Sequence, residues 1–181
     1  KKNICTSRSF GIMITDLDTL SEVISMFATR CAEKLRYEKS CAKIITIFIT
    51  SNPFRQDLPQ YKNCIRMKFI VETDSTNEII KHALHGLKSI YKKNYKYKKC
   101  GVILSGIINK SEVQYNIFDN IDRNKQNKLM KTIDEINTKM GRDSIKYVSQ
   151  GLRKNDWTLK RQTLSPSYTT QWNCLPLINT K

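Results

Sequence analysis

Helix-type and strand-type apolar spacing alternate along the first 110 residues, and this order restricts the fold more than any other feature of the sequence. Apolar residues recur at helical spacing over residues 20–35 and again over residues 80–91. Stretches typical of strands precede, separate and follow them, at residues 2–7, 44–50, 64–70 and 101–108. The order predicts an α+β fold, a split βαββαβ unit in which two helices cover one face of a four-stranded sheet.

Both predicted helices carry a capping-box pattern at their start. Thr19 with Glu22, and Ser75 with Glu78, place a hydroxyl and a carboxylate three residues apart. In this pattern the two side chains satisfy the opening backbone amides of the helix. We therefore expect the helices to begin at Thr19 and Ser75.

The pattern changes after residue 110. Asp122 is expected to cap a third helix that stops at Gly141. Its expected inward residues are Leu129, Ile133, Ile136 and Met140. A tail rich in Lys, Ser, Thr and Pro follows, and we expect a partner to cover its large aromatic residues, Trp157, Tyr168 and Trp172. The predicted organisation is a domain at 1–110, a linker at 111–123 and a C-terminal extension at 124–181, which holds the helix and the partner-binding tail.

The chain is strongly basic. Lysine and arginine number 32 against 16 acidic residues, a formal net charge of +16. Such a surplus favours polyanions, nucleic acid first and an anionic membrane second, with a basic surface that has no dedicated ligand as the alternative. No apolar run approaches the roughly 18 residues of a membrane span. The start Lys1-Lys2-Asn3 is not that of a signal peptide, and we expect a piece of a longer protein.

Six scattered cysteines form no C-x-x-C pair. A zinc site or a disulfide framework would require clustering, so buried, reduced thiols in a reducing compartment are expected. This favours a cytoplasmic protein.

Three groups of residues are candidates for binding phosphates. Alternation over 64–70 places Arg66 and Lys68 on the sheet face away from the helices, although solvated strand cations are also common. Between Lys88 and Lys99 stand six lysines and three tyrosines without an acid, and the tyrosines either stack on sugars and bases or anchor the loop. Two hydroxyls and a guanidinium at the first strand suit one phosphate. The predicted contacts are Ser7, Arg8, Ser9, Arg66, Lys68, Lys96, Lys98 and Lys99.

The sequence is poor in catalytic constellations. Asp16 and Asp18 form the only close carboxylate pair that could suggest two-metal chemistry, but they precede a helix, where aspartates serve as caps. His82 and His85 have a metal-compatible spacing, but without an acidic or cysteine partner nearby a packing or surface role is favoured. We expect no catalytic residue, metal or cofactor in this chain.

Five stretches, taken together and in order, resemble the C-terminal part of Y-family translesion DNA polymerases of the UmuC type. They are residues 7–11, 50–54, 97–102, 114–119 and 164–170. The resemblance implies a little-finger domain that lies in the DNA major groove, with Arg8 at the family's phosphate-contacting position. The family's palm, fingers and thumb, which hold its metal-binding carboxylates, are absent from this sequence. A parent polymerase would therefore supply catalysis, with Mg²⁺.

The resemblance also implies protein partners. Gln114, Ile117 and Phe118 match the family's sliding-clamp-binding pentapeptide, although an isoleucine replaces the usual leucine. In that role Gln114 would hydrogen-bond the clamp while the two apolar side chains fill a pocket; the alternative is that they fold back onto their own domain. The tail resembles the extension that contacts the UmuD′ subunit and RecA. The implied setting is SOS translesion synthesis on damaged primer–template DNA in the bacterial cytoplasm, at the nucleoid.

Two other classes of function remain open at this point. An RNA-binding split-βαβ module would use aromatic residues on the outward strand positions, which are cationic here. A protein–protein scaffold would bind neither DNA nor RNA at moderate salt.

Overall fold

The computed structural model describes residues 2–114, 116, 119, 121–151, 157 and 167–175, and the predicted order of strands and helices is confirmed within them. The domain consists of β1 (Asn3–Ile14), α1 (Leu17–Tyr37), β2 (Ser40–Ser51), β3 (Lys62–Thr73), α2 (Thr76–Ile90) and β4 (Tyr97–Asn109). It is followed by α3 (Arg123–Lys139) and by short 3₁₀ turns at Lys110–Glu112, Val148–Gln150 and Trp172–Cys174. None of the described helices combines the length and apolar composition needed to cross a membrane.

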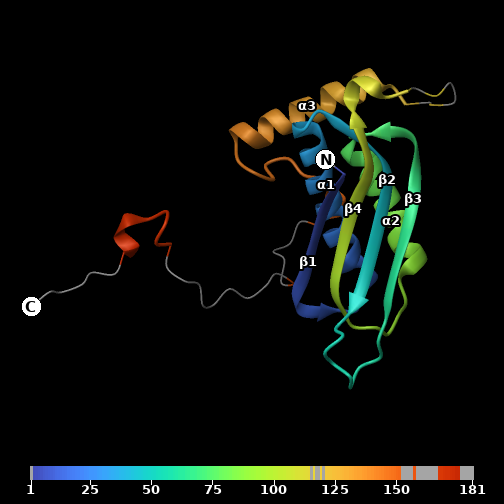
Figure 1. The fold of residues 1–181 in the computed structure, drawn as a ribbon, viewed down its shortest axis with the longest axis vertical. Coiled ribbons are helices and arrows are strands. Elements are labelled where there is room, and N and C mark those ends of the chain that lie inside the picture. The colour runs from blue at the N-terminus through green and yellow to red at the C-terminus, as the bar shows by residue number, and fades with distance from the viewer. Residues whose placement is uncertain are drawn as a thin grey trace, which may run out of the picture.

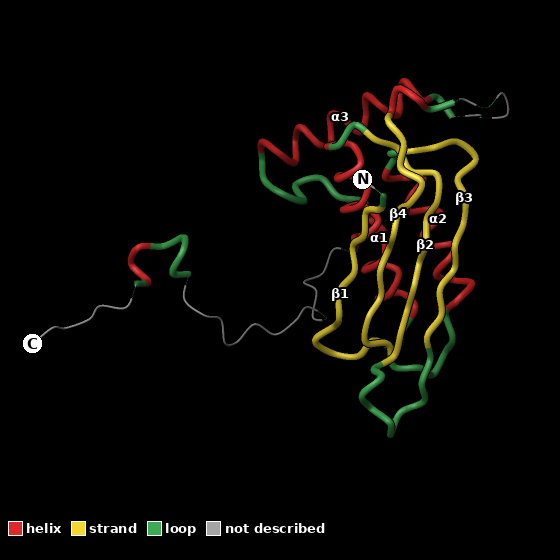
Figure 2. The backbone as a smooth tube through the Cα atoms, in the orientation of Figure 1, coloured by secondary structure: helices red, strands yellow, loops and turns green. Residues whose placement is uncertain are grey.

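The four strands form one antiparallel sheet in the order β1-β4-β2-β3. Each strand–helix–strand unit is split, because β4 lies between β1 and β2 while β2 lies between β3 and β4. Figures 1 and 2 show α1 and α2 side by side behind the sheet, which leaves its other face open. The predicted fold class is therefore confirmed.

The core lies between the sheet and its two helices. Ile45, Ile47 and Ile49 of β2 are fully buried and face the apolar stripes of α1 and α2. Gly86 lets α2 approach the sheet, since a Cβ there would lie 2.7 Å from the Met67 side chain on β3. Burial of these β-branched and aliphatic side chains is the main stabilising contribution.

The helix starts differ in part from the prediction. The cap of α1 is Asp16, whose carboxylate accepts a hydrogen bond from the Thr19 amide at 2.7 Å, so the predicted box at Thr19 is wrong. Ser75 does precede α2, but its hydroxyl makes no capping bond and instead accepts one from Gln126 of α3 at 2.6 Å. Both Asp and Thr cap well, and sequence spacing does not decide between neighbouring candidates.

β1 continues to Ile14, well past the predicted strand. Phe10 and Ile14 are buried, but the pairing with β4 shifts register between Ser9 and Ile14. This irregularity breaks the two-residue alternation on which the prediction depended.

α3 is capped as predicted, by Asp122, which accepts from the Lys125 amide at 3.0 Å. The helix ends at Lys139, and Gly141 follows with φ +104°. The predicted inward face is wrong for Leu129 and Met140, whose side chains are 54% and 77% exposed, whereas Ile133 and Ile136 are half-buried. The buried apolar residue of α3 is Met130.

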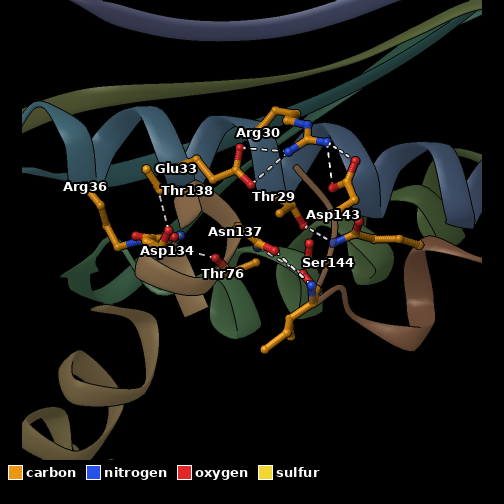
Figure 3. A network of polar contacts seen from close by, with 12 residues as sticks. Thr29, Arg30, Glu33, Arg36, Thr76, Asp134, Asn137, Thr138, Asp143 and Ser144 are labelled. Carbon is orange, nitrogen blue, oxygen red and sulfur yellow. Dashed lines mark hydrogen bonds and ion pairs between the residues drawn. The ribbon is translucent and has the colours of Figure 1, made fainter. Parts of the chain in front are cut away.

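Ion pairs hold α3 and the segment after it against the domain (Figure 3). Arg36 of α1 donates two hydrogen bonds to the Asp134 carboxylate, at 2.6 and 2.8 Å, and two more to the start of α2. Arg30 pairs with Glu33 of its own helix and with Asp143 beyond α3. The third helix is therefore attached by polar contacts more than by apolar packing.

The chain then returns along α1 and reaches the edge of β1. Gln150 donates a hydrogen bond to the Thr29 hydroxyl at 2.7 Å. Trp157 is buried edge-on against Phe10 and Phe27, and its carbonyl accepts from the Gly11 amide at 2.9 Å. The expectation that a partner covers Trp157 is wrong, since this side chain joins the core of the domain. Of the other two tail aromatics, Tyr168 and Trp172 are 48% and 86% exposed, and their binding to a partner stays a prediction.

Candidate nucleic-acid interface

Four cross-strand rows make up the regularly paired part of the open face, and beyond them the alternation of β3 continues to Ile70 and to Glu72, which pairs with Lys43 at 3.1 Å. Directly paired residues of neighbouring strands point to the same face, so the register gives the members of each row. In the order β1, β4, β2, β3 the rows are Ser9, Lys99, Thr50, Lys62; Ser7, Gly101, Phe48, Cys64; Cys5, Ile103, Thr46, Arg66; and Asn3, Ser105, Ile44, Lys68. These positions hold four cations and no acidic residue.

Three of the four cations lie on β3. Arg66 and Lys68 are exposed and face away from the helices, which confirms their predicted placement. Lys62 lies on the same face and was missed, because it precedes the stretch in which the alternation was recognised. Continuing the alternation from Arg66 back through Cys64 would have found it.

A phenylalanine, Phe48, lies at the centre of this face. A Cβ on Gly101 would lie 2.5 Å from the Phe48 ring and 2.5 Å from the Cβ of Ser7. The glycine therefore provides the space in which the ring lies across β4. Phe48 is the single aromatic residue among the positions of the four rows.

The predicted trio on β1 is divided between the two faces. Ser7 and Ser9 lie on the open face, in rows that also hold Cys64 and Lys62. Arg8 instead pairs with Cys100, which is fully buried under the helices, so the exposed Arg8 side chain leaves the strand on the opposite face at the sheet edge. Strand alternation thus separates Arg8 from the two serines.

The predicted lysine cluster is also dispersed. Lys99 joins the open face in the row of Ser9, and Lys96 is exposed in the turn before β4. The Lys98 ammonium donates a hydrogen bond to the Phe10 carbonyl at 2.6 Å and ties β4 to β1. Of the three, Lys98 has a structural contact.

The tyrosines of this region anchor the loops. Tyr97 is fully buried, and its hydroxyl bonds both the amide and the carbonyl of Lys92 at 2.9 Å. Tyr91 donates to the Thr15 carbonyl at 2.7 Å. Burial raises the pKa of Tyr97 above its ordinary value. These contacts favour the anchoring interpretation over base stacking.

The carboxylate and histidine candidates have structural contacts as well. Asp16 caps α1, and the His82 ring lies edge-on against Phe69 with Nδ1 2.9 Å from the Glu78 carbonyl oxygen. Within the described part of the chain, no three His, Cys, Asp or Glu side chains gather into a group that would hold a metal ion.

The cysteines fall into two classes. Cys31, Cys41 and Cys100 are buried, and loss of hydration raises the pKa of Cys31 to about 11, that of Cys41 to about 12, and that of Cys100 as well. Cys5 and Cys64 are exposed, and both lie on the open face. Burial is thus confirmed for three of the thiols.

The predicted clamp peptide follows β4 and the turn at Lys110–Glu112. Gln114 is exposed, whereas Ile117 and Phe118 lie outside the described residues. After the peptide the chain is held again, since Asp119 accepts a hydrogen bond from Arg123 at 2.7 Å. That bond lowers the pKa of Asp119. The peptide therefore stands between two anchored points.

Two family models match the chain. Residues 1–117 match the C-terminal domain of the impB/mucB/samB family, and residues 127–178 match a domain of unknown function, DUF4113. Among solved structures, the insertion ternary complex of Dbh DNA polymerase covers 59% of this chain with a TM-score of 0.45 and 16% identity, over 29% of its own length.

Curated relatives extend over nearly the whole chain. Protein ImpB of Salmonella typhimurium is 36% identical over 98% of this chain, and Protein UmuC of S. typhimurium strain LT2 is 34% identical over 97%. Protein MucB of Escherichia coli is 34% identical over 100% of this chain. The chain spans 42% of the length of each of these relatives. The resemblance to UmuC is therefore confirmed, and the chain belongs to the impB/mucB/samB family, with residues 1–117 as its C-terminal domain.

Proposed function

We propose that this chain is the non-catalytic C-terminal region of an error-prone, UmuC-like Y-family DNA polymerase that acts in SOS translesion synthesis. The observation that carries the proposal is the open sheet face, which presents Lys62, Arg66, Lys68 and Lys99 without an acidic residue among its row positions. The family membership supports the identity of the parent protein. Its setting is the bacterial cytoplasm, at the nucleoid.

The open face grips primer–template DNA through phosphates. Same-face residues two apart on a strand are separated by about 6.7 Å, so Arg66 and Lys68 reach neighbouring phosphate groups. Contacts of this kind position a duplex and carry no sequence information. An enzyme that accepts damaged templates requires such a grip. Nucleotide transfer, with Mg²⁺, takes place in the parts of the polymerase beyond this chain.

The peptide after β4 connects this grip to a sliding clamp. Gln114 hydrogen-bonds the clamp while Ile117 and Phe118 fill an apolar pocket on it. The tether raises the local concentration of the polymerase at the primer end without changing the DNA contact. The exposed tail aromatics Tyr168 and Trp172 are available to a UmuD′-like subunit and to RecA.

Charge reversal on the open face tests the DNA grip. The double variant Arg66→Glu/Lys68→Glu should bind primer–template DNA about tenfold more weakly or worse. The negative slope of log K against log salt should become shallower by about 0.9 for each phosphate that the variant no longer neutralises. Fluorescence anisotropy over a salt series measures both quantities.

The control carries the same charge change on the other side of the molecule. Lys81 and Lys88 are exposed on α2, behind the sheet. If Lys81→Glu/Lys88→Glu weakens binding as much as the open-face variant, overall charge rather than the open face governs affinity. Tighter binding of structured RNA than of primer–template DNA at equal salt would instead favour an RNA-binding module.

Calorimetric titration into a bacterial sliding clamp tests the tether. Ile117→Ala/Phe118→Ala should abolish binding, because an aromatic plug contributes about 2–4 kcal/mol. Leu129→Ala/Met140→Ala removes exposed apolar side chains from α3 and should leave binding unchanged. Undetectable binding by the unaltered chain would contradict the tether and leave the DNA grip standing.

A further inference from the structure

One aromatic side chain is held out in solvent at the end of the sheet. Phe54 is 90% exposed in the loop between β2 and β3, which extends beyond the strands (Figure 1). A phenyl ring in water contributes little to folding, because its apolar surface remains hydrated. Such a ring is instead typical of a binding residue when its backbone is fixed.

The loop around Phe54 is fixed by side-chain contacts. The Asn52 side chain accepts from the Phe54 amide at 3.1 Å. The Gln60 amide nitrogen lies 2.8–3.1 Å from the carbonyl oxygens of Asn52, Arg55 and Leu58. The Gln60 oxygen accepts from the Ser51 hydroxyl at 3.0 Å. Phe54 is therefore presented by an organised loop.

Aromatic packing joins this loop to the lysine-rich turn before β4. The ring of Tyr61 lies 4.9 Å from that of Tyr95 and 6.2 Å from that of Tyr97. The ammonium of Lys92 lies 5.0 Å from the centre of the Tyr61 ring. The two loops thus form one structural unit at this end of the sheet.

The unit is rich in cations. Residues 52–62 and 91–96 contain one acidic residue, Asp57, and its carboxylate is paired with Arg55 at 2.6 and 2.7 Å. That pair lowers the pKa of Asp57 to about 2. The lysines of the unit are Lys62, Lys92, Lys93 and Lys96. Lys62 also belongs to the outermost row of the open face, so the two cationic surfaces are continuous.

We propose that this end of the sheet binds single-stranded DNA where it leaves the duplex on the open face. The Phe54 ring stacks on an unpaired base, and the neighbouring lysines contact the phosphates beside it. An aromatic face stacks on every base and so tolerates any sequence. The proposal rests on the proposed function, since it requires a duplex on the open face.

The experiment compares two DNA substrates that differ in one feature. Blunt duplex and the same duplex with a single-stranded template overhang are titrated against the chain, with 2-aminopurine in the overhang to report stacking. Phe54→Ala should weaken overhang binding by about 5- to 150-fold, the amount that one base–aromatic stack contributes, and should leave blunt-duplex affinity unchanged. Phe54→Trp should retain both the affinity and the quenching of 2-aminopurine.

Tyr37→Ala is the matched control. Tyr37 ends α1 and is 91% exposed, so its removal deletes an equally exposed aromatic ring and should change neither substrate's affinity. Equal affinities of the Phe54→Ala variant and the unaltered chain for the overhang would overturn the stacking role while leaving the duplex grip intact. Failure of the unaltered chain to bind blunt duplex would overturn the proposed function and, with it, this site.

Discussion

At the scale of single residues, the reactivity of the exposed cysteines can be used to test whether DNA binds to the open face. Cys5 and Cys64 are exposed there, whereas Cys31, Cys41 and Cys100 are buried with raised pKa values. In a Cys174→Ser variant, a maleimide at neutral pH should therefore label two thiols rapidly and the other three only on unfolding.

Bound DNA should protect both reactive thiols, because it covers the face on which they lie. Mass spectrometry of the labelled peptides measures the rates with and without primer–template DNA. Unaltered labelling at saturating DNA would place the duplex elsewhere on the molecule. Equal labelling of all five thiols in the native chain would contradict the burial of the other three.

At the scale of elements, α3 is held by charge more than by apolar packing. Asp134→Ala should loosen this helix, because Arg36 then keeps its contacts to the start of α2 but has no partner on α3. The expected decrease in stability is about 1 kcal/mol, since the Asp134 side chain is 35% exposed. Hydrogen exchange should quicken in Arg123–Lys139 and stay slow in the sheet.

Glu135→Ala supplies the comparison for that measurement. Glu135 neighbours Asp134 but makes only a 3.9 Å pair with Lys131 on the exposed side of the helix, so its removal should leave exchange unchanged. Equal protection of α3 in both variants would show that apolar packing holds the helix instead, through the buried Met130, whose sulfur lies 3.5 Å from the Tyr147 hydroxyl.

At the scale of the whole molecule, the sequence predicts which residues form helices and strands, and which face of a strand each residue lies on, better than it predicts which segments lie side by side in the fold. The alternation that includes Arg66 and Lys68 identified the open face, because a strand's period depends only on local residues. Alternation gives no information about which strands are neighbours in the sheet. Arg8 is separated from Ser7 and Ser9 because β1 extends beyond the predicted strand and includes all three residues, which therefore alternate between its two faces. The inward face of α3 depends on Arg36, which is remote in sequence, so helical periodicity selected Leu129 and Met140 incorrectly.

The same distinction between local and distant information applies to the residues of the proposed binding surfaces. Arg66 and Lys68 were recognised from their own strand, whereas the role of Lys62 and the position of Phe54 beside the turn before β4 depend on pairing between distant segments. Trp157 is the clearest case, because residues of β1 and α1 provide its site. Nothing near position 157 in the sequence indicates that contact.

The strand order also determines when the domain can fold as the ribosome makes it. β2 and β3 are neighbours in sequence and can form a hairpin early, but β1 pairs only with β4, as in the pairing of Ser7 with Gly101. Contacts between such distant residues form late, because the loop between them must close first. Within this domain, the strand that leaves the ribosome first is therefore the last to pair. Until β4 emerges, the nascent chain must keep an unpaired strand from associating with others.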